Sequence, residues 1–210
     1  MNILVLGAGN MGAAFVKQLN RAGHQVSVTA RDGAKAQAVV AANPGATAVA
    51  SVNAAAAVEV VVLATGYADA VSALQSVGDL SGKVVIDITN PLTDDYMGLT
   101  LGHSTSAAEE IAKAVPAALL VKAFNTVFAP VLAEGADLGN GQTVTVFVAS
   151  DSERAKQTAV ALAQSMGFVT IDAGGLKNAR YLEPLAGLNI YLGYGAGLGT
   201  SIAPTWIRKA

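Results

Sequence analysis

A glycine-rich turn close to the N-terminus constrains the fold more than any other feature of the chain. The apolar run Ile3 to Leu6 leads directly into Gly7-Ala8-Gly9-Asn10-Met11-Gly12, and a helical pattern follows. A strand, this glycine spacing and a helix, in that order, are typical of a dinucleotide-binding βαβ unit. The first glycine permits the tight turn, the second lets a pyrophosphate approach the backbone, and the third lets helix and strand pack closely. We therefore predict that residues 7–12 bind the pyrophosphate of a dinucleotide at the N-terminus of the helix.

The rest of the chain continues the same alternation of strand and helix. Short, fully apolar runs indicate strands buried on both faces, which is typical of a parallel, doubly wound α/β sheet, the Rossmann NAD(P)-binding fold. The predicted strands cover residues 3–6, 25–29, 60–64, 84–88, 119–123, 144–149 and 168–171. The predicted helices cover residues 11–22, 34–42, 68–77, 106–114 and 152–166.

The alternation loosens between residues 129 and 142, around Pro130, and then resumes. We therefore predict a dinucleotide-binding domain over residues 1–140 and a small C-terminal α/β lobe over residues 141–210. The lobe is expected to contribute to the substrate pocket and to a dimer contact. A chain of 210 residues leaves no room for a separate catalytic domain of ordinary size.

The end of the second predicted strand selects the cofactor. NAD-binding proteins place Asp or Glu there to hold the 2'-hydroxyl of the ribose, whereas this strand ends Thr29-Ala30-Arg31. The Arg31 guanidinium matches a 2'-phosphate, the Thr29 hydroxyl donates a hydrogen bond, and Lys35 lies one helical turn further on the same side. Asp32 leaves an alternative open, because it either holds the 2'-hydroxyl of NAD or caps the next helix. On this pattern we expect NADP(H) rather than NAD(H).

Three further strands end in polar residues at the sheet edge where open α/β folds bind ligands. The segments are Ala64-Thr65-Gly66-Tyr67, Asp87-Ile88-Thr89-Asn90-Pro91-Leu92 and Lys122-Ala123-Phe124-Asn125-Thr126. We expect Ala64 and Thr65 to border the nicotinamide half of the cofactor, and Asn90 and Asn125 to orient its carboxamide and ribose. Asp87 lies within a strand and is expected to be a hydrogen-bonded structural residue.

The residue types present exclude several kinds of catalysis. The sequence contains no cysteine, and its two histidines, His24 and His103, lack the spacing of metal ligands. We predict no metal site, and we expect His103 to lie at the surface. No Ser-His-Asp order or convincing carboxylate pair is present, so no catalytic side chain is predicted. Hydride transfer between stacked rings needs none, because the cofactor supplies the chemistry and the protein supplies the alignment.

The composition also limits the partners. The chain is 13% charged with a net charge of -2, so we expect no nucleic-acid partner. The N-terminus lacks the pattern of a signal peptide, which predicts a cytoplasmic protein. The uncharged segment Leu185 to Pro204 approaches the length of a membrane span, but its glycines favour an internal or interface helix followed by a glycine-rich loop. We therefore predict no membrane contact and a homodimer that uses residues 185–202.

Together these motifs resemble the coenzyme F420-dependent NADP oxidoreductases, a family that also includes the cytosolic reductase domain of the STEAP metalloreductases. The resemblance spans nearly the whole chain. Besides the glycine turn and Ala30-Arg31 with Lys35, it is carried by Thr89-Asn90-Pro91-Leu92, Ser106-Ala107-Ala108-Glu109, Val121-Lys122-Ala123-Phe124-Asn125-Thr126, Asp172-Ala173-Gly174-Gly175-Leu176 and Asn178-Ala179-Arg180-Tyr181-Leu182-Glu183.

The resemblance implies an oxidoreductase that transfers hydride between NADPH and a small-molecule acceptor with a flavin-like ring, with coenzyme F420 as the best single candidate. By the same resemblance, the residues that bind the 2'-phosphate are Ala30, Arg31 and Lys35. The residues implied to line the rest of the dinucleotide site are Tyr67, Val71 and Ala123. Residues 195–199 are implied to help form the pocket of the deazaflavin.

Two rival functions stay open. One is the NADPH-dependent reduction of another acceptor, a flavin or a quinone, and the other is an NADP-binding redox sensor without turnover. An open pocket beside C4 of the nicotinamide favours an enzyme, whereas a pocket filled by Trp206 or Tyr191 favours a sensor.

Overall fold

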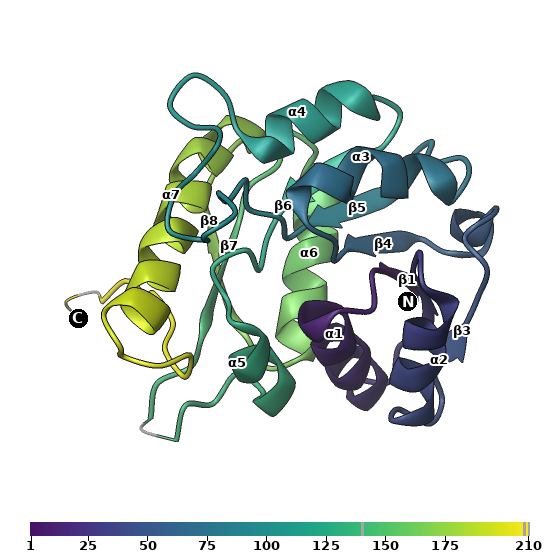
Figure 1. Cartoon of the computed structure of the whole chain (residues 1–210), viewed down its shortest axis with the longest axis horizontal. Coiled ribbons are helices and arrows are strands. Elements are labelled where there is room, and N and C mark those ends of the chain that lie inside the picture. The colour runs from purple at the N-terminus through teal and green to yellow at the C-terminus, as the bar shows by residue number, and fades with distance from the viewer. Residues whose placement is uncertain (140, 208, 210) are drawn as a thin grey trace.

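The computed structural model describes residues 1–139, 141–207 and 209, and a six-stranded parallel sheet forms its centre (Figure 1). The strands lie in the order β3-β2-β1-β4-β5-β6. The chain therefore adds β2 and β3 on one side of β1, and then crosses back to add β4, β5 and β6 on the other side. This is the strand order of a doubly wound dinucleotide-binding fold, which confirms the predicted fold class. The strands are β1 Asn2–Leu6, β2 Gln25–Thr29, β3 Thr47–Ala48, β4 Val60–Leu63, β5 Val84–Asp87 and β6 Leu119–Lys122.

Apolar side chains on both faces of the sheet hold helices against both sides. In β1, Ile3 and Val5 belong to one buried cluster and Leu4 and Leu6 to another, because successive side chains of a strand point to opposite faces. Side chains of α1, α2, α5 and α6 pack into the first cluster and those of α3 and α4 into the second. The helices are α1 Asn10–Arg21, α2 Gly33–Ala41, α3 Tyr67–Ser76, α4 Ala107–Ala114, α5 Ala129–Glu134 and α6 Glu153–Ser165.

The last third of the chain adds a second, two-stranded parallel sheet. Strand β7, Thr145–Val148, pairs with β8, Val169–Asp172, and an antiparallel bridge between Lys122 and Ala149 links it to the end of β6. Buried residues of β7 and α6 belong to the same cluster as those of β1 and α1, so the two sheets share a core. The boundary predicted at residue 140 falls outside the described residues, and the division into two domains stays a prediction.

One helix lies where the sequence predicts an irregular stretch. Helix α5 begins at residue 129 and buries Val131 and Leu132 in the cluster that also contains side chains of α1. Pro130 occupies its first turn, where the backbone N–H groups have no partner within the helix and a missing N–H is tolerated. The prediction of an irregular stretch that begins at residue 129 was therefore wrong.

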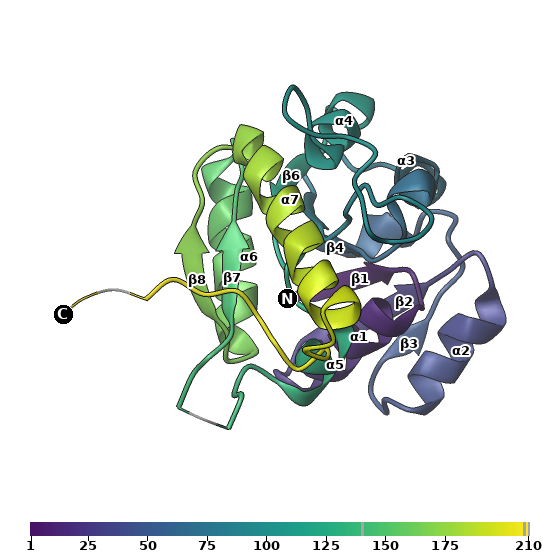
Figure 2. The ribbon, with the colours of Figure 1, turned by 60° about the vertical axis from the view of Figure 1, so that its left-hand side comes forward.

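The final helix, α7, spans Ala179–Ile190 and continues into a π-helical turn, η3, over Tyr191–Gly195. The sequence predicts helix here only from Leu185, where the uncharged segment begins. The structure accommodates Pro184 inside α7, so the predicted helix is present but begins earlier. Figure 2 shows α7 crossing the molecule between the small sheet and the side that carries α3 and α4.

Two short 3-10 turns, η1 Ala54–Ala57 and η2 Leu176–Asn178, complete the ordered elements of the described part. None of the helices in residues 1–139 and 141–207 combines the length and the hydropathy that crossing a bilayer requires.

Candidate functional site

The glycine turn between β1 and α1 has no room for side chains at its two outer glycines. Gly7 has a φ of +120°, and a Cβ there would lie 2.4 Å from the carbonyl oxygen of Ala64. A Cβ at Gly12 would lie 2.0 Å from the carbonyl oxygen of Gly7. These two glycines therefore let α1 begin directly against the ends of the neighbouring strands β1 and β4.

The middle glycine of the turn has a different environment. A Cβ at Gly9 would have no atom within 4 Å, and the φ of -80° suits any residue. Gly9 is the N-cap of α1 and provides no side-chain cap, so the N–H groups of the first turn are left for a ligand. A diphosphate fits this place, because it brings negative charge to the positive end of the helix and accepts hydrogen bonds from those groups.

A groove with a volume of about 620 Å³ leads from this turn along the carboxyl ends of β1, β2 and β4. We call it the glycine groove. Its lining residues are Leu6, Gly7, Gly9, Thr29, Ala30, Arg31, Ser51, Ala64, Thr65, Gly66, Asp69, Ser72, Ala73 and Ser76. The predicted cofactor residues among them are Gly7, Gly9, Thr29, Ala30, Arg31, Ala64 and Thr65. The groove thus contains five of the residues predicted for the adenosine and diphosphate half, together with Ala64 and Thr65, which were predicted to border the nicotinamide half.

Arg31 lies at the outer wall of the glycine groove. Its side chain is 89% exposed, and Nη1 lies 3.5 Å from Oδ1 of Asp69 in the first turn of α3. An ion pair this exposed contributes little, so Arg31 can exchange Asp69 for a ligand phosphate. Asp32 is engaged elsewhere, because its Oδ1 accepts a 3.0 Å hydrogen bond from the N–H of Ala34 and caps α2. Of the two interpretations of Asp32, the structure supports the helix cap.

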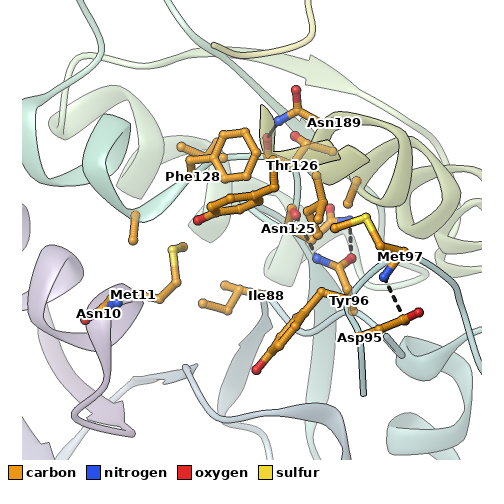
Figure 3. Close-up of a pocket in the computed structure, with 16 residues that line it drawn as sticks. Asn10, Met11, Ile88, Asp95, Tyr96, Met97, Asn125, Thr126, Phe128 and Asn189 are labelled. Carbon is orange, nitrogen blue, oxygen red and sulfur yellow. Dashed lines mark hydrogen bonds between the residues drawn. The ribbon is translucent and has the colours of Figure 1, made fainter. Parts of the chain in front are cut away.

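A second hollow, with a volume of about 580 Å³, lies beside the glycine groove (Figure 3). We call it the asparagine pocket. Its lining residues are Asn10, Met11, Ile88, Asn90, Asp95, Tyr96, Met97, Asn125, Thr126, Val127, Phe128, Ala129, Ala186, Asn189, Ile190 and Tyr194. Gly9 lines the groove and Asn10 lines the pocket, so both hollows border the start of α1. The predicted cofactor residues in the pocket are Asn10, Met11, Asn90 and Asn125.

Two asparagines at the strand ends hold each other in place. Asn90 Nδ2 donates to the carbonyl oxygen of Asn125 at 2.9 Å, and Asn125 Nδ2 donates to Oδ1 of Asn90 at 3.0 Å. Asn125 Nδ2 also donates to the carbonyl oxygen of Leu182 in α7 at 2.8 Å. Asn189, further along α7, donates to the carbonyl oxygen of Thr126 at 3.1 Å. These bonds fix α7 as one wall of the pocket.

Four buried side-chain oxygens at the ends of β4, β5 and β6 have no hydrogen-bond partner within the described part of the chain. They are Oγ1 of Thr65, Oγ1 of Thr89, Oδ1 of Asn125 and Oγ1 of Thr126. A buried polar atom without a partner is unfavourable, and native proteins hold few of them. Asn125 and Thr126 line the asparagine pocket, Thr65 lines the glycine groove, and Thr89 lines neither, so a polar ligand in the two hollows would lie beside three of these residues. The carboxamide and ribose hydroxyls of a nicotinamide nucleotide are donors of this kind.

A buried ion cluster adjoins the pocket. Lys122 Nζ lies 2.9 Å from Oδ2 of Asp87 and 2.8 Å from Oε1 of Glu183, and all three side chains are at most 2% exposed. Glu183 also accepts hydrogen bonds from two backbone N–H groups at the start of α4. Asp87 and Lys122 end β5 and β6, whereas Glu183 belongs to α7, so the cluster fastens α7 to the sheet. As predicted, Asp87 is hydrogen-bonded within the fold.

Charge and burial set the ionisation of the groups near this cluster. Burial alone would lower the pKa of Lys122, but the carboxylates of Asp87 and Glu183 raise it above its ordinary value. At the start of α3, burial and the carboxylates of Glu110, Glu183 and Asp87 raise the pKa of the Tyr67 phenol. At neutral pH, Lys122 is therefore an ammonium and Tyr67 a neutral phenol.

The other predicted cofactor residues do not line either hollow. They are Ala8, Gly12, Lys35, Tyr67, Val71 and Ala123. Ala123 is fully buried in the core, and Lys35 is exposed on α2. Tyr67 and Val71 are half-buried on α3 and pack against the second apolar cluster. Their part in cofactor binding stays a prediction.

Sequence reasoning missed the apolar walls of the asparagine pocket. Tyr96 and Met97 come from the loop after β5, Phe128 from the start of α5, and Tyr194 from the π-helical turn. The rings of Phe128 and Tyr194 meet edge to face with centroids 5.8 Å apart. The uncharged segment from Leu185 to Pro204, which contains Tyr194, was the sequence feature that could have indicated an apolar wall. Residues 195–199, which the resemblance places at the acceptor, are exposed and lie just beyond the lining.

The remaining sequence predictions concern metals and assembly. His103 lies exposed in a loop, as predicted. Across the described residues, no group of three or more His, Asp and Glu side chains is arranged to hold a metal. The outer side of α7 and the turn that follows expose Tyr181, Leu188 and Tyr191. Leu188 and Tyr191 lie within residues 185–202, the segment predicted to form the homodimer contact, and the homodimer stays a prediction.

The sequence matches a known protein-family model over residues 2–91, described as NADP oxidoreductase, coenzyme F420-dependent. The F420-dependent NADP reductase of Methanothermobacter marburgensis is 31% identical over 209 residues, which cover 91% of this chain and 92% of that protein. Metalloreductase STEAP3 of Rattus norvegicus is 38% identical over 115 residues, or 54% of this chain. The matched part is only 22% of that metalloreductase, about a fifth of its length.

The fold is also similar to a solved structure. The crystal structure of a candidate F420-dependent NADP reductase from Arthrobacter sp. FB24 matches 99% of this chain and 100% of its own, with a TM-score of 0.87 and 30% identity. The similarity therefore includes the small sheet and α7 as well as the glycine turn.

Proposed function

Because the chain belongs to the family of coenzyme F420-dependent NADP oxidoreductases, we propose that it transfers hydride between NADPH and an acceptor with a flavin-like ring. Coenzyme F420 is the best single candidate, since relatives that match most of the chain are F420-dependent NADP reductases. The observation that carries the proposal is the open asparagine pocket, which borders the start of α1 next to the glycine groove.

The residues of the glycine groove fit NADP(H). The open space at Gly9 and the N–H groups that follow it accommodate the diphosphate, and Arg31 with Thr29 lies where the 2'-phosphate is expected. The unpartnered oxygens of Thr65 in the groove and of Asn125 in the asparagine pocket are candidates to accept hydrogen bonds from the ribose and the carboxamide. When bound, NADPH supplies the hydride.

Alignment is the main task left to this chain. The overall exchange moves one hydride, which is two electrons and a proton, to the acceptor ring, and solvent supplies the second proton. Met11, Ile88 and Phe128 line the asparagine pocket (Figure 3), and their apolar surfaces would help to exclude water from between two stacked rings. Holding two reactants at reacting distance is itself a large catalytic contribution, so the step does not require a side-chain acid.

The placement of two aromatic residues favours the enzyme over the redox sensor. Trp206 packs against Phe147 with ring centroids 5.2 Å apart and does not line the asparagine pocket. Tyr191 is 52% exposed and is also outside the lining. Neither ring fills the pocket, which leaves room for a second substrate.

The proposal is tested by NADPH oxidation with F420, riboflavin, FMN and menadione as acceptors. With F420, deuterium from one C4 position of NADPH, and not from the other, is expected in the reduced deazaflavin. Oxidation is expected to persist in chelator, and His103→Ala is expected to change the rate little. If none of the acceptors oxidises NADPH with the folded, NADPH-saturated protein, the enzyme proposal is wrong and the redox sensor takes its place.

Arg31→Ala is expected to weaken NADPH binding by about 1 to 3 kcal/mol, because a charge-assisted contact with phosphate is lost. NADH binding is expected to stay almost unchanged, since NADH has no 2'-phosphate. Dissociation constants for both nucleotides, measured by calorimetric titration, check the difference. Lys113→Ala is the matched control, because it removes an exposed cation that pairs with Glu110 on α4, outside both hollows. Equal losses for NADPH and NADH would show that Arg31 does not read the 2'-phosphate.

A further inference from the structure

One buried amide at the asparagine pocket has an oxygen that is left without a donor. Asn125 follows β6, lines the pocket and is only 6% exposed. Three of the four unpartnered buried oxygens are threonine hydroxyls, which can donate as well as accept. Oδ1 of Asn125 is the fourth, and a carbonyl oxygen can only accept. A ligand that satisfies this atom must therefore bring an N–H or O–H group.

The neighbouring carbonyl groups determine which way round this amide lies. The side chain of Asn90 meets the backbone carbonyl oxygen of Asn125 at 2.9 Å, so the atom there is Nδ2 and its other polar atom is Oδ1. The side chain of Asn125 meets that Oδ1 at 3.0 Å and the carbonyl oxygen of Leu182 at 2.8 Å with one and the same atom. Both neighbours only accept, so this atom is Nδ2, and both of its hydrogens are used. Turning the amide over would set an oxygen against two oxygens, so Oδ1 of Asn125 is locked as an acceptor.

The place of Asn125 in the sheet indicates which end of the dinucleotide lies beside it. A doubly wound fold of this strand order consists of two mononucleotide-binding halves, and the dinucleotide lies across the point where they meet. The glycine groove, with Arg31, borders β1, β2 and β4 and suits the adenosine end. Asn90 and Asn125 follow β5 and β6 in the other half, where the nicotinamide end is expected. The oxidised pyridine ring has no N–H of its own, so its donor is the NH2 group of the carboxamide.

We propose that Oδ1 of Asn125 accepts a hydrogen bond from the carboxamide NH2 and thereby selects a cofactor whose ring substituent can donate. The inference rests on the proposed function, because it concerns the cofactor of that hydride transfer. NADP⁺ and its thionicotinamide analogue both carry the NH2 group. The acetylpyridine analogue of NADP⁺ has a methyl group in its place and leaves the buried oxygen without a donor. Its affinity is therefore expected to be about three- to tenfold lower.

Equilibrium binding of these three oxidised nucleotides, with no hydride acceptor present, tests the proposal. The unaltered protein is expected to prefer NADP⁺ and the thionicotinamide analogue over the acetylpyridine analogue by about three- to tenfold. Asn125→Leu removes the oxygen at similar volume and is expected to bring this preference close to one.

The ratio of affinities is the quantity to compare, because a general disturbance of the pocket lowers all three affinities together and cancels. Asn43→Leu is the matched control. Asn43 Nδ2 also donates to a backbone carbonyl oxygen, that of Val39, but Asn43 lies outside both hollows. Its ratio is expected to equal that of the unaltered protein. If Asn125→Leu does not fold, as judged by circular dichroism, Asn125→Ala replaces it.

Two results would overturn the inference while NADP⁺ still binds. One is equal affinity of the unaltered protein for NADP⁺ and the acetylpyridine analogue. The other is an unchanged ratio in the Asn125 variant, which would assign the oxygen to a ribose hydroxyl that all three nucleotides share, or to the hydride acceptor. A folded protein that binds none of the nucleotides would overturn the proposed function as well. Failure of hydride transfer alone leaves the binding ratios, and with them the inference, to be decided by this measurement.

Discussion

Gly9→Val is expected to abolish NADPH binding while the protein still folds. The backbone at Gly9 has a φ of -80°, and a Cβ there meets no atom within 4 Å, so the fold has room for the new side chain. That room is the space in which the diphosphate would approach the first turn of α1, and valine would occupy it. Circular dichroism and thermal unfolding report the fold. Titration with NADPH, up to concentrations that saturate the unaltered protein, reports the binding.

Two other glycines make this experiment specific. Gly102→Val is the matched control, because Gly102 also has no neighbour within 4 Å of a Cβ and lies outside both hollows. NADPH binding is expected to survive there. Gly12→Ala is expected to destabilise the fold itself, since its Cβ would lie 2.0 Å from the carbonyl oxygen of Gly7. A folded Gly9→Val protein with unchanged NADPH affinity would remove the glycine turn from the cofactor site.

Lys122→Met is expected to lower the free energy of unfolding by about 3 to 5 kcal/mol. The substitution keeps the apolar stem of the side chain but leaves the carboxylates of Asp87 and Glu183 buried without their cation. An unpaired charge in the interior loses its hydration without compensation, which is why breaking a buried pair is far more harmful than breaking an exposed one. Urea denaturation at neutral pH measures the loss. The dependence of the unfolding free energy on urea concentration is compared between the two proteins.

A second lysine provides the comparison. Lys156 Nζ lies 3.0 Å from Asp172, whose side chain is 60% exposed, and Lys156→Met is expected to cost less than about 1 kcal/mol. Replacing the whole cluster, as Asp87→Asn, Lys122→Met and Glu183→Gln together, is expected to recover much of the loss from Lys122→Met alone. Equal losses for Lys122→Met and Lys156→Met would contradict the assignment of the cluster as the anchor of α7.

The pH dependence of stability has a definite sign at this cluster. The folded state raises the pKa of Lys122 above its ordinary value of 10.5. The stabilisation is therefore complete below that ordinary value and is lost as the pH rises through the higher pKa of the folded state. The Lys122→Met protein has no lysine to deprotonate at this position and does not lose stability in this way. The free energies of unfolding of the two proteins are therefore expected to converge at strongly alkaline pH.

Local patterns were sufficient to predict five of the six strands of the main sheet and the cofactor end, but not the two-residue edge strand β3, Thr47–Ala48. The turn from β1 into α1 and the positions of Arg31 and Asp32 depend on residues close together in sequence, where strand period, glycine spacing and capping rules apply. The sequence alone could not decide whether Asp32 caps a helix or holds a ribose. The hydrogen bond from the N–H of Ala34 decides this in favour of the cap.

The acceptor end depends on contacts between distant parts of the chain, which no local pattern contains. Met11 and Tyr194 line one pocket although nearly the whole chain separates them. Glu183 meets Lys122 only because α7 crosses the carboxyl end of the sheet. Helix α7, on which both contacts depend, was predicted only from Leu185, where the uncharged segment begins, whereas the helix spans Ala179–Ile190.

Most residues of the two hollows occupy different parts of the chain, so they are synthesised at different times. The glycine groove uses no residue beyond Ser76, whereas the asparagine pocket requires Asn189 and Tyr194. A ribosome delivers the chain from its N-terminus, so the residues of the cofactor half emerge well before those of the acceptor half. The residues that line the glycine groove are therefore all synthesised before the first residue of α7, the helix that forms one wall of the asparagine pocket.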